Sequence, residues 1–196
     1  MLDIPYVTYT TKSGDTRTMS LTSRLLKDRI ILCTGEVTAE LAESVIAQLL
    51  YLESEDKKKP VTMIVTGPGG SVTAGMSIIT CMQTLSCPVH TIVSGMVASM
   101  SSMIAMAGEK GQRFAYPCSR FMLHTVSSGA QGKIQDMEIS LAETRNINEM
   151  IFKLMAKCTG KKVEELKKIC DRDFWLSETE AIKFGACDKI INKHKA

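Results

Sequence analysis

Short, mainly apolar runs alternate along the chain with longer stretches in which apolar residues recur every three or four positions. The runs at 29–34, 61–65 and 89–93 are rich in isoleucine and valine, which is typical of buried strands. Between them, the apolar spacing over 38–53 and over 71–85 predicts two helices, the first of them capped by Thr38. Strands that alternate with helices favour a mostly parallel sheet covered by helices.

Helical spacing continues in the second half of the chain. Small and apolar residues over 98–107 predict a helix after the third strand, and a long amphipathic helix is predicted over 134–158. This long helix has no partner of equal length in the sequence, so we expect it to project and to pack against another subunit. Ser177 and Glu180 form an S-x-x-E capping box that opens the last helix. At the other end, residues 1–20 predict a flexible arm or a small hairpin.

The composition narrows the class of protein. The chain has 196 residues, of which 44% are hydrophobic and 23% are charged, so a single globular domain with a substantial core is expected. Its 24 basic and 21 acidic residues give a net charge of +3, too small an excess to indicate nucleic-acid binding. Residues 74–108 carry no Asp, Glu, Lys or Arg, but polar side chains interrupt the run and favour a buried core over a membrane span.

The cysteines indicate the redox environment. There are 7, scattered without a C-x-x-C pair, which argues against a disulfide framework or a structural zinc site and predicts free thiols in a reducing compartment. We expect most of them to be small core residues. The first residues lack the pattern of a secretory signal peptide. A cytoplasmic protein is therefore expected, or an organellar stromal one after removal of a transit peptide.

Two residues are candidates for nucleophilic catalysis. Ser99 follows a predicted strand and a glycine, at the first turn of a small-residue helix, so its hydroxyl is expected near the positive end of that helix. The backbone N–H of Met100 is then placed to point at a developing oxyanion. His124 ends a predicted strand and is the best placed of three histidines for a general base. Taken alone, each residue is more often structural.

A glycine-rich segment, GPGG at 67–70, follows the second predicted strand and is expected to end it. Gly69 and Gly70 allow backbone amides to approach a substrate closely, as an oxyanion hole or a peptide-binding edge requires. A phosphate-binding loop is the alternative, but the segment does not follow the G-x-x-x-x-G-K-[ST] pattern and has no lysine nearby.

Several long segments, in order over nearly the whole chain, carry a resemblance. They are SRLLKDRII (23–31), VIAQLLYLESED (45–56), GPGGSVTAGM (67–76), GMVASMSSM (95–103), FAYPCSRFMLH (114–124), GAQGK (129–133) and DRDFWLSETEAIKFGACDKII (171–191). Together they resemble the ClpP serine peptidase family, the proteolytic subunit of Clp proteases. The resemblance implies an α/β fold of the ClpP and crotonase type, a superhelix of repeated β-β-α units with a protruding handle helix. It also implies an N-terminal axial arm over 1–20 and one peptidase domain over 21–196, with the handle region at about 125–158.

The resemblance implies a serine endopeptidase that cleaves unfolded polypeptides through an acyl-enzyme. Its catalytic triad carries over as Ser99, the nucleophile, His124, the base, and Asp173, the orienting acid. The backbone amides of Gly70 and Met100 form the implied oxyanion hole. An extended substrate is expected to pair with backbone at the remaining assigned residues, which are Gly69, Ser71, Val72, Gly129, Ala130, Gln131 and Gly132. No metal and no cofactor are expected in this chain, since ATP is used by the partner ATPase.

The resemblance further implies how the subunit assembles. Two seven-membered rings, formed by this chain alone or with a second ClpP isoform, stack through the 134–158 helix into a tetradecamer that encloses the active sites. Asp171 and Arg172 match positions used in ring-to-ring contacts, and an ordinary surface ion pair is the alternative. A Clp-family AAA+ ATPase unfolds protein substrates and feeds them into the chamber. No nucleic-acid or membrane partner is expected.

The chain departs from the family pattern at three places. Thr125 and Val126 follow the histidine where most relatives have Gln-Pro, so a rigid proline beside the base is lost. Residues 66–70 read TGPGG instead of N-S-P-G-G, which removes a side-chain hydrogen-bonding group before the glycines. The clefts that dock the ATPase use aromatic residues at positions that are here Thr62, Ile64 and Thr84. We therefore expect weak docking of an ATPase to this chain alone, as in a second isoform.

Two other functions remain open at the level of the sequence. A catalytically silent structural or regulatory subunit of a mixed Clp barrel carries the same assembly motifs, but the intact Ser99, His124 and Asp173 argue against it. A crotonase-type acyl-CoA enzyme shares the glycine-rich oxyanion architecture without needing the triad, and the chain is short for that class.

Overall fold

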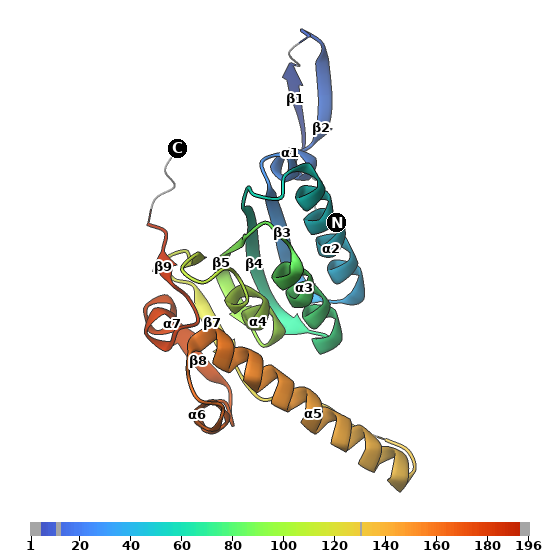
Figure 1. Ribbon diagram of the computed structural model, residues 1–196, viewed down its shortest axis with the longest axis vertical. Helices are drawn as coiled ribbons and strands as arrows, with labels where there is room; N and C mark the ends of the chain where they lie inside the picture. Colours follow the sequence, from blue (N-terminus) through green and yellow to red (C-terminus); the bar gives the residue numbers. More distant parts are fainter. Residues whose placement is uncertain (1–4, 11–12, 130, 193–196) are drawn as a thin grey trace.

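The computed structural model describes residues 5–10, 13–129 and 131–192 (Figure 1). The strands are β1 (Tyr6–Thr10), β2 (Thr16–Ser20), β3 (Ile30–Val37), β4 (Val61–Gly70), β5 (Val89–Ala98), β6 (Arg113–Ala115), β7 (Arg120–Leu123), β8 (Phe174–Ser177) and β9 (Lys189–Ile190). The helices are α1 (Leu21–Lys27), α2 (Ala39–Glu55), α3 (Val72–Thr84), α4 (Met100–Met106), α5 (Ile134–Thr159), α6 (Val163–Ile169) and α7 (Glu178–Phe184).

The large sheet is mostly parallel, as the sequence predicts. Its order is β3-β4-β5-β6-β9, and β7 pairs with both β5 and β8. The β7–β8 pair is antiparallel, and the other pairs in this sheet are parallel. Strands and helices alternate from β3 to α4, which gives the predicted α/β class. Because β4, β5 and β7 run in the same direction, their carboxyl ends meet at one edge of the sheet.

Side-chain caps begin two helices at the predicted positions. The Thr38 hydroxyl accepts the Leu41 N–H at 3.2 Å at the start of α2. Ser177 and Glu180 form the predicted capping box on α7, in which the Glu180 carboxylate accepts the Ser177 N–H at 2.8 Å. The hydrogen bonds from Ser177 hold the pKa of Glu180 below its ordinary value. These caps explain why the sequence pattern located both helices within a residue or two.

The glycine-rich segment belongs to a strand, and the expectation that it ends the strand was wrong. β4 continues through 67–70 to its last residue, Gly70. Register shifts on both the β3 side and the β5 side mark bulges, which let the chain pass this irregular stretch without leaving the sheet. Beyond the bulge on the β3 side, Gly69 and Gly70 pair with Glu36 and Val37.

A buried ion pair anchors the C-terminal strand. Arg113, with a side chain only 5% exposed, donates to both carboxylate oxygens of Asp188, from Nη2 at 2.6 Å and from Nε at 2.9 Å. The backbone N–H groups of Gly111 and Arg113 donate to the same carboxylate at 2.8 and 3.0 Å. Arg113 Nη1 also donates to the carbonyls of Met106 and Cys158, at the C-terminal ends of α4 and α5. One guanidinium therefore holds β6, the start of β9 and two helix ends together.

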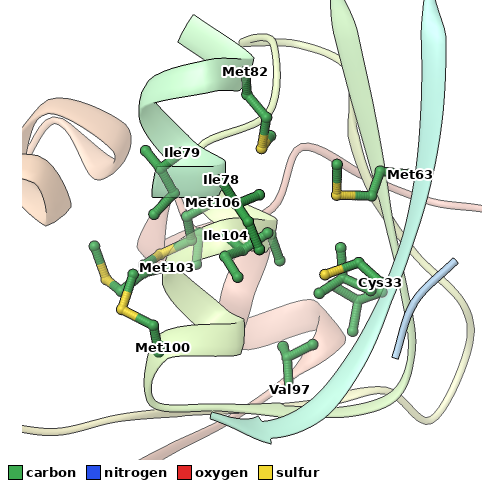
Figure 2. Packing of buried hydrophobic residues seen from close by; sticks show 14 of the residues in the cluster. Cys33, Met63, Ile78, Ile79, Met82, Val97, Met100, Met103, Ile104 and Met106 are labelled. Carbon is green, nitrogen blue, oxygen red and sulfur yellow. The ribbon is translucent and has the colours of Figure 1, made fainter. Parts of the chain in front are cut away.

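The core lies between the sheet and helices α2, α3 and α4. Figure 2 shows Ile78 and Ile79 of α3 with Ile104 of α4, beside the strand residues Cys33 and Met63, and all of these are buried. Methionines fill much of the remaining space, and those labelled on the helices are at most 6% exposed, namely Met82, Met100, Met103 and Met106. A core rich in methionine adapts easily to irregular gaps between helices.

Most of the cysteines are core residues, as expected. Cys33, Cys87, Cys170 and Cys187 are buried, whereas Cys118 is exposed. Burial raises the pKa of Cys33 and of Cys170 to about 11, so both are protonated thiols at neutral pH. These buried thiols act as small apolar groups.

Two elements extend away from the sheet at opposite ends of the molecule (Figure 1). At one end, β1 and β2 form an antiparallel hairpin, so the described part of residues 1–20 is the hairpin alternative of the sequence analysis. At the other end, α5 is buried only near its C-terminus, at Ile151, Phe152 and Met155. Its exposed N-terminal half carries apolar side chains, which are Ile134, Ile139 and Leu141. No helix in the described ranges is long and apolar enough to cross a membrane.

Candidate active site

Ser99 lies at the junction of β5 and α4. It is the residue before the first helical residue and has φ 52° and ψ −123°. Non-glycine residues rarely adopt this conformation, which costs about 1–3 kcal/mol. The Ser99 N–H donates to the Met122 carbonyl on β7 at 2.9 Å, and the Ser99 carbonyl accepts the Ser102 N–H at 3.1 Å. These bonds hold the strained turn, and the Ser99 hydroxyl makes no capping bond to α4.

His124 is in hydrogen-bond contact with Ser99. The distance from His124 Nε2 to Ser99 Oγ is 2.7 Å. His124 directly follows β7, which pairs with the end of β5 in parallel, so neighbouring strands bring both side chains to the same edge. The imidazole is 22% exposed. In this geometry an imidazole nitrogen can accept the hydroxyl proton as the oxygen attacks an electrophile.

Asp173 lies on the far side of the imidazole, at a longer distance. Its Oδ1 is 3.8 Å from His124 Nδ1, and its side chain is 63% exposed. This distance exceeds that of a hydrogen bond. Asp173 lies in the turn between α6 and β8, and β8 pairs with β7, the strand that carries His124. Sheet pairing therefore places the Asp173 carboxylate near His124 Nδ1, but the two groups do not form a hydrogen bond.

The glycine-rich backbone at the end of β4 lies beside Ser99. Gly70 and Met100 line the same pocket as Ser99 and His124. Gly69 contacts the nucleophile directly, since a Cβ on Gly69 would lie 2.6 Å from Ser99 Cβ and 3.0 Å from the Met100 nitrogen. The φ of Gly69, 98°, also favours glycine. The close approach that the glycines were predicted to allow is therefore made to Ser99 itself.

A pocket of about 130 Å³ opens beside Ser99 and His124. Its apolar lining comes from α3, α4, α5, the end of β7 and the segment after His124, at Val72, Met103, Leu123, Val126, Ile151 and Met155. Of these apolar residues, only Val72 was predicted from the sequence to bind substrate. The α5 residues were missed because the whole helix was expected to face another subunit. A larger cavity of about 440 Å³ lies at the C-terminal ends of α3, α4 and α5 and has a different lining.

The other predicted substrate-binding residues lie in two places. Ser71 caps α3, next to the pocket residue Val72. Gly129 lines a depression of about 240 Å³ against α5 instead of the pocket beside Ser99. Gln131 and Gly132, farther along this segment, are exposed. Ala130 lies outside the described residues. The structure therefore brings 69–72 to the nucleophile and leaves Gly129 apart from it.

The segment after the base is held by two hydrogen bonds. The Thr125 N–H donates to the Cys170 carbonyl at 3.1 Å, and the Val126 N–H donates to Asn148 Oδ1 on α5, also at 3.1 Å. A proline at position 126 has no N–H and could not make the second bond. Asn148 was not identified from the sequence, because it belongs to no recognised motif. Its contact with Val126 exists only in the folded chain.

The residues assigned to contacts with other chains lie at the surface. Asp171 and Arg172 are exposed in the turn before Asp173. Thr62 and Ile64 lie on the less buried face of β4. Thr84, at the end of α3, is exposed.

A strained serine at a strand–helix junction, paired with an imidazole and flanked by glycine backbone, defines the class of serine hydrolases. Comparisons with known proteins name the family. The Clp protease family model matches residues 13–194. The chain is 41% identical over 192 residues to ATP-dependent Clp protease proteolytic subunit 2 of Chlamydia trachomatis serovar D, covering 98% of this chain and 94% of that protein.

Two further relatives give the same result. Subunit 2 of Chlamydia abortus is 40% identical over 98% of this chain and 93% of its own length, and subunit 1 of Chlamydia felis is 40% identical over 98% and 94%. The chain therefore belongs to the Clp protease family and is a serine endopeptidase of the ClpP type, as the sequence motifs indicated. The acyl-CoA alternative receives no support from these matches.

Proposed function

We propose that this chain is the proteolytic subunit of an ATP-dependent Clp protease, with Ser99, His124 and Asp173 as its catalytic triad. The observation that carries the assignment is the 2.7 Å contact between Ser99 Oγ and His124 Nε2 at the carboxyl edge of the sheet. Asp173 approaches the other imidazole nitrogen, where a carboxylate orients the ring and stabilises the imidazolium.

The chemistry follows from these positions. Ser99 Oγ attacks the carbonyl carbon of the scissile peptide bond while its proton passes to His124 Nε2. The Gly70 and Met100 amides stabilise the negative oxygen of the tetrahedral intermediate. When the C–N bond breaks, His124 gives the proton to the leaving amine. Water then hydrolyses the acyl-enzyme with His124 as the base. These steps use only groups of this chain and one water molecule, so the proposal includes no metal and no cofactor.

The pocket beside Ser99 supports a preference at the cleavage site. Its apolar lining and volume of about 130 Å³ suit an apolar side chain on the residue that supplies the attacked carbonyl. The methionines of the lining allow different apolar side chains to fit. An extended, unfolded polypeptide is the substrate form that can reach Ser99 and lie along the 69–72 backbone.

The assembly and its partners are part of the proposal. Two heptameric rings, homomeric or mixed with a second isoform, stack through α5, whose exposed Ile134, Ile139 and Leu141 need a covering partner. Asp171 and Arg172 contact the opposite ring. A Clp-family ATPase, which uses the ATP, delivers unfolded substrates in the cytoplasm. Docking of this ATPase to a homomeric ring is weak, because Thr62, Ile64 and Thr84 offer no aromatic surface.

A catalytically silent subunit of a mixed barrel is the second candidate. The observation in its favour is the position of Asp173, which is 63% exposed and 3.8 Å from His124 Nδ1. An imidazole without its orienting carboxylate is a poor base in a serine peptidase. The two candidates differ in whether Ser99 reacts.

A serine-directed fluorophosphonate probe tests the proposal on the purified protein. We expect labelling at Ser99, located by mass spectrometry, and hydrolysis of a fluorogenic peptide with an apolar residue before the cleaved bond. Ser99→Ala should abolish labelling and lower kcat on the order of 10⁶-fold. Alanine keeps a Cβ at this position, so the backbone strain is unchanged. Ser77→Ala is the matched control, since Ser77 is an exposed serine on α3.

The same assay in a mixture separates the two candidates. The protein is combined with a ClpP that carries the standard Gln-Pro and N-S-P-G-G motifs. Labelling of the isolated protein supports the triad in a single kind of ring. Labelling only in the mixture means that the partner ring is needed to bring Asp173 to His124. Absence of labelling in both samples favours the silent subunit and contradicts the proposed function.

A further inference from the structure

The GPGG segment must keep a fixed shape beside the nucleophile although it has few side chains. A Cβ on Gly69 would lie 2.6 Å from Ser99 Cβ, so the segment packs tightly against the nucleophile. The φ of Gly69, 98°, is one that glycine adopts freely. A peptide group flanked by glycines rotates easily. A partner from outside the segment is therefore needed to fix its amides.

Ser101 on α4 provides that partner. The Gly69 N–H donates to Ser101 Oγ at 3.1 Å, and Ser101 is 2% exposed. The same oxygen lies 3.1 Å from the point that a Cβ on Gly67 would occupy. Position 67 is where this chain has glycine in place of the serine of N-S-P-G-G. The carbonyl oxygen of Gly35 lies closer still to that point, so backbone on one side and the Ser101 hydroxyl on the other leave no room for a side chain at position 67.

The role of Ser101 differs from that of the other buried hydroxyls nearby. Ser102 donates to the carbonyls of Val97 and Met122, and Ser119 donates to the carbonyl of Val93. Each of these hydroxyls ties a helix or loop to a strand. Ser101 instead accepts from an amide of the segment that lines the catalytic pocket.

We propose that Ser101 is a positioning residue for the oxyanion hole. Its hydroxyl fixes the Gly69 amide and thereby orients the next amide, that of Gly70, toward the reacting carbonyl. Ser101 is two residues from Ser99 on the same junction, so its oxygen moves together with the nucleophile. The inference rests on the proposed function, in which the Gly70 N–H stabilises the tetrahedral intermediate. The hydroxyl that holds the segment therefore comes from α4, while position 67 of the segment carries no side chain.

The test compares Ser101→Ala with Ser119→Ala, which removes an equally buried hydroxyl away from the site. We expect Ser101→Ala to lower kcat for a fluorogenic peptide about 10- to 100-fold while KM changes less than about twofold. The affinity for a peptide boronate, whose tetrahedral adduct needs the oxyanion hole, should fall by a similar factor. Ser101→Thr keeps an acceptor oxygen and should restore kcat to within about threefold. Ser119→Ala should leave kcat and boronate affinity unchanged.

A readout without catalysis separates this inference from the proposed function. Amide hydrogen exchange at Gly69 should be faster in Ser101→Ala than in the unmodified chain, and unchanged in Ser119→Ala. If the unmodified chain neither hydrolyses peptides nor reacts with fluorophosphonate but shows this exchange pattern, the proposed function fails and the positioning role stands.

Other results would overturn the positioning role. The first is a kcat that does not change in Ser101→Ala. The second is an equal loss of kcat in Ser119→Ala, and the third is a loss of kcat in Ser101→Ala without any loss of boronate affinity. Ser101→Gly lacks the same hydroxyl and replaces Ser101→Ala if that variant does not assemble.

Discussion

Two aspartates each lie beside a basic side chain, Asp188 beside Arg113 and Asp173 beside His124, and the two contacts differ sharply. The Asp188 carboxylate is 16% exposed and accepts hydrogen bonds from Arg113 at 2.6 and 2.9 Å and from two backbone amides. The Asp173 carboxylate is 63% exposed and lies 3.8 Å from His124 Nδ1. Asp188 is fully engaged within one chain, whereas Asp173 has a single long contact with its proposed partner.

The difference follows from where each carboxylate lies. Asp188 precedes a strand of the sheet, and the sheet and two helix ends surround it. Asp173 lies in a surface turn next to Asp171 and Arg172, which we propose to face the opposite ring. Several short hydrogen bonds fix a group in place, and one long contact leaves it mobile. The fold of a single subunit therefore fixes Asp188 in its framework, and we propose that assembly brings Asp173 into position.

The largest expected effect is on catalysis, from Asp173→Asn. We expect kcat to fall on the order of 10³- to 10⁴-fold, because the imidazole loses the carboxylate that selects its tautomer. The thermal unfolding midpoint should stay nearly unchanged, since the side chain is 63% exposed. Steady-state kinetics and calorimetry of the purified assembly measure the two quantities. A loss of less than about tenfold in kcat would contradict the assigned role.

The complementary variant, Asp188→Asn, should affect stability instead. Removing one charge leaves the Arg113 guanidinium buried without its counter-ion, which costs on the order of 3–5 kcal/mol of unfolding free energy. The activity of the folded fraction should change little, because neither residue lines the pocket beside Ser99. Denaturant unfolding at a fixed protein concentration measures the loss. Glu43→Gln, which removes one charge at an exposed site on α2, is the control, and an equal effect in that variant would refute the comparison.

Acid should weaken the same pair. Burial by itself raises the pKa of Asp188, but the hydrogen bonds from Arg113 and the backbone amides hold it below its ordinary value of 3.8. A carboxyl whose pKa is lower in the folded state stabilises the fold at pH values above its unfolded pKa, and the stabilisation is lost as the pH falls through the folded pKa. Unfolding free energy measured from pH 5 downward should therefore fall less steeply in Asp188→Asn. Identical slopes would show that the pair does not contribute to acid unfolding.

The smallest expected effect is from Asn148→Ala, next to the base. The Val126 N–H loses its acceptor, so the segment after His124 becomes less ordered and kcat should fall by about two- to tenfold. Asn146→Ala is the matched control on the same helix, because the Asn146 side chain bonds to Glu143 at the surface. Equal kcat values for the two variants would mean that Asn148 does not hold the base segment.

The sequence allowed the main helices and the first strands to be located, because their apolar spacing and caps are local signals. Thr38 and the Ser177–Glu180 box begin their helices as predicted. The glycines at 67–70 were interpreted as a strand end, because a local rule for turns does not include the bulges that keep the segment in the sheet. β8 and β9 were missed, since both depend on pairing with strands far away in the sequence.

The candidate site shows the same division between local and long-range information. The junction at Ser99 and the strand end at His124 could be identified from the sequence, and the family motif supplied Asp173. Their mutual distances depend on the pairing of β5 with β7 and of β7 with β8. Ser101 lies within the GMVASMSSM segment but received no role from it, and Asn148 lies outside all the quoted segments. The contacts of both residues with the site exist only in the folded chain.

The backbone conformation of Ser99 has a consequence for how the sequence evolves at this position. Glycine adopts φ 52° without the cost that serine carries, so selection for stability alone would replace the residue. We expect Ser99→Gly to be more stable than the unmodified chain and to have no nucleophile. The strained turn at Ser99 is therefore a cost in stability that the fold carries for the hydroxyl it presents to His124.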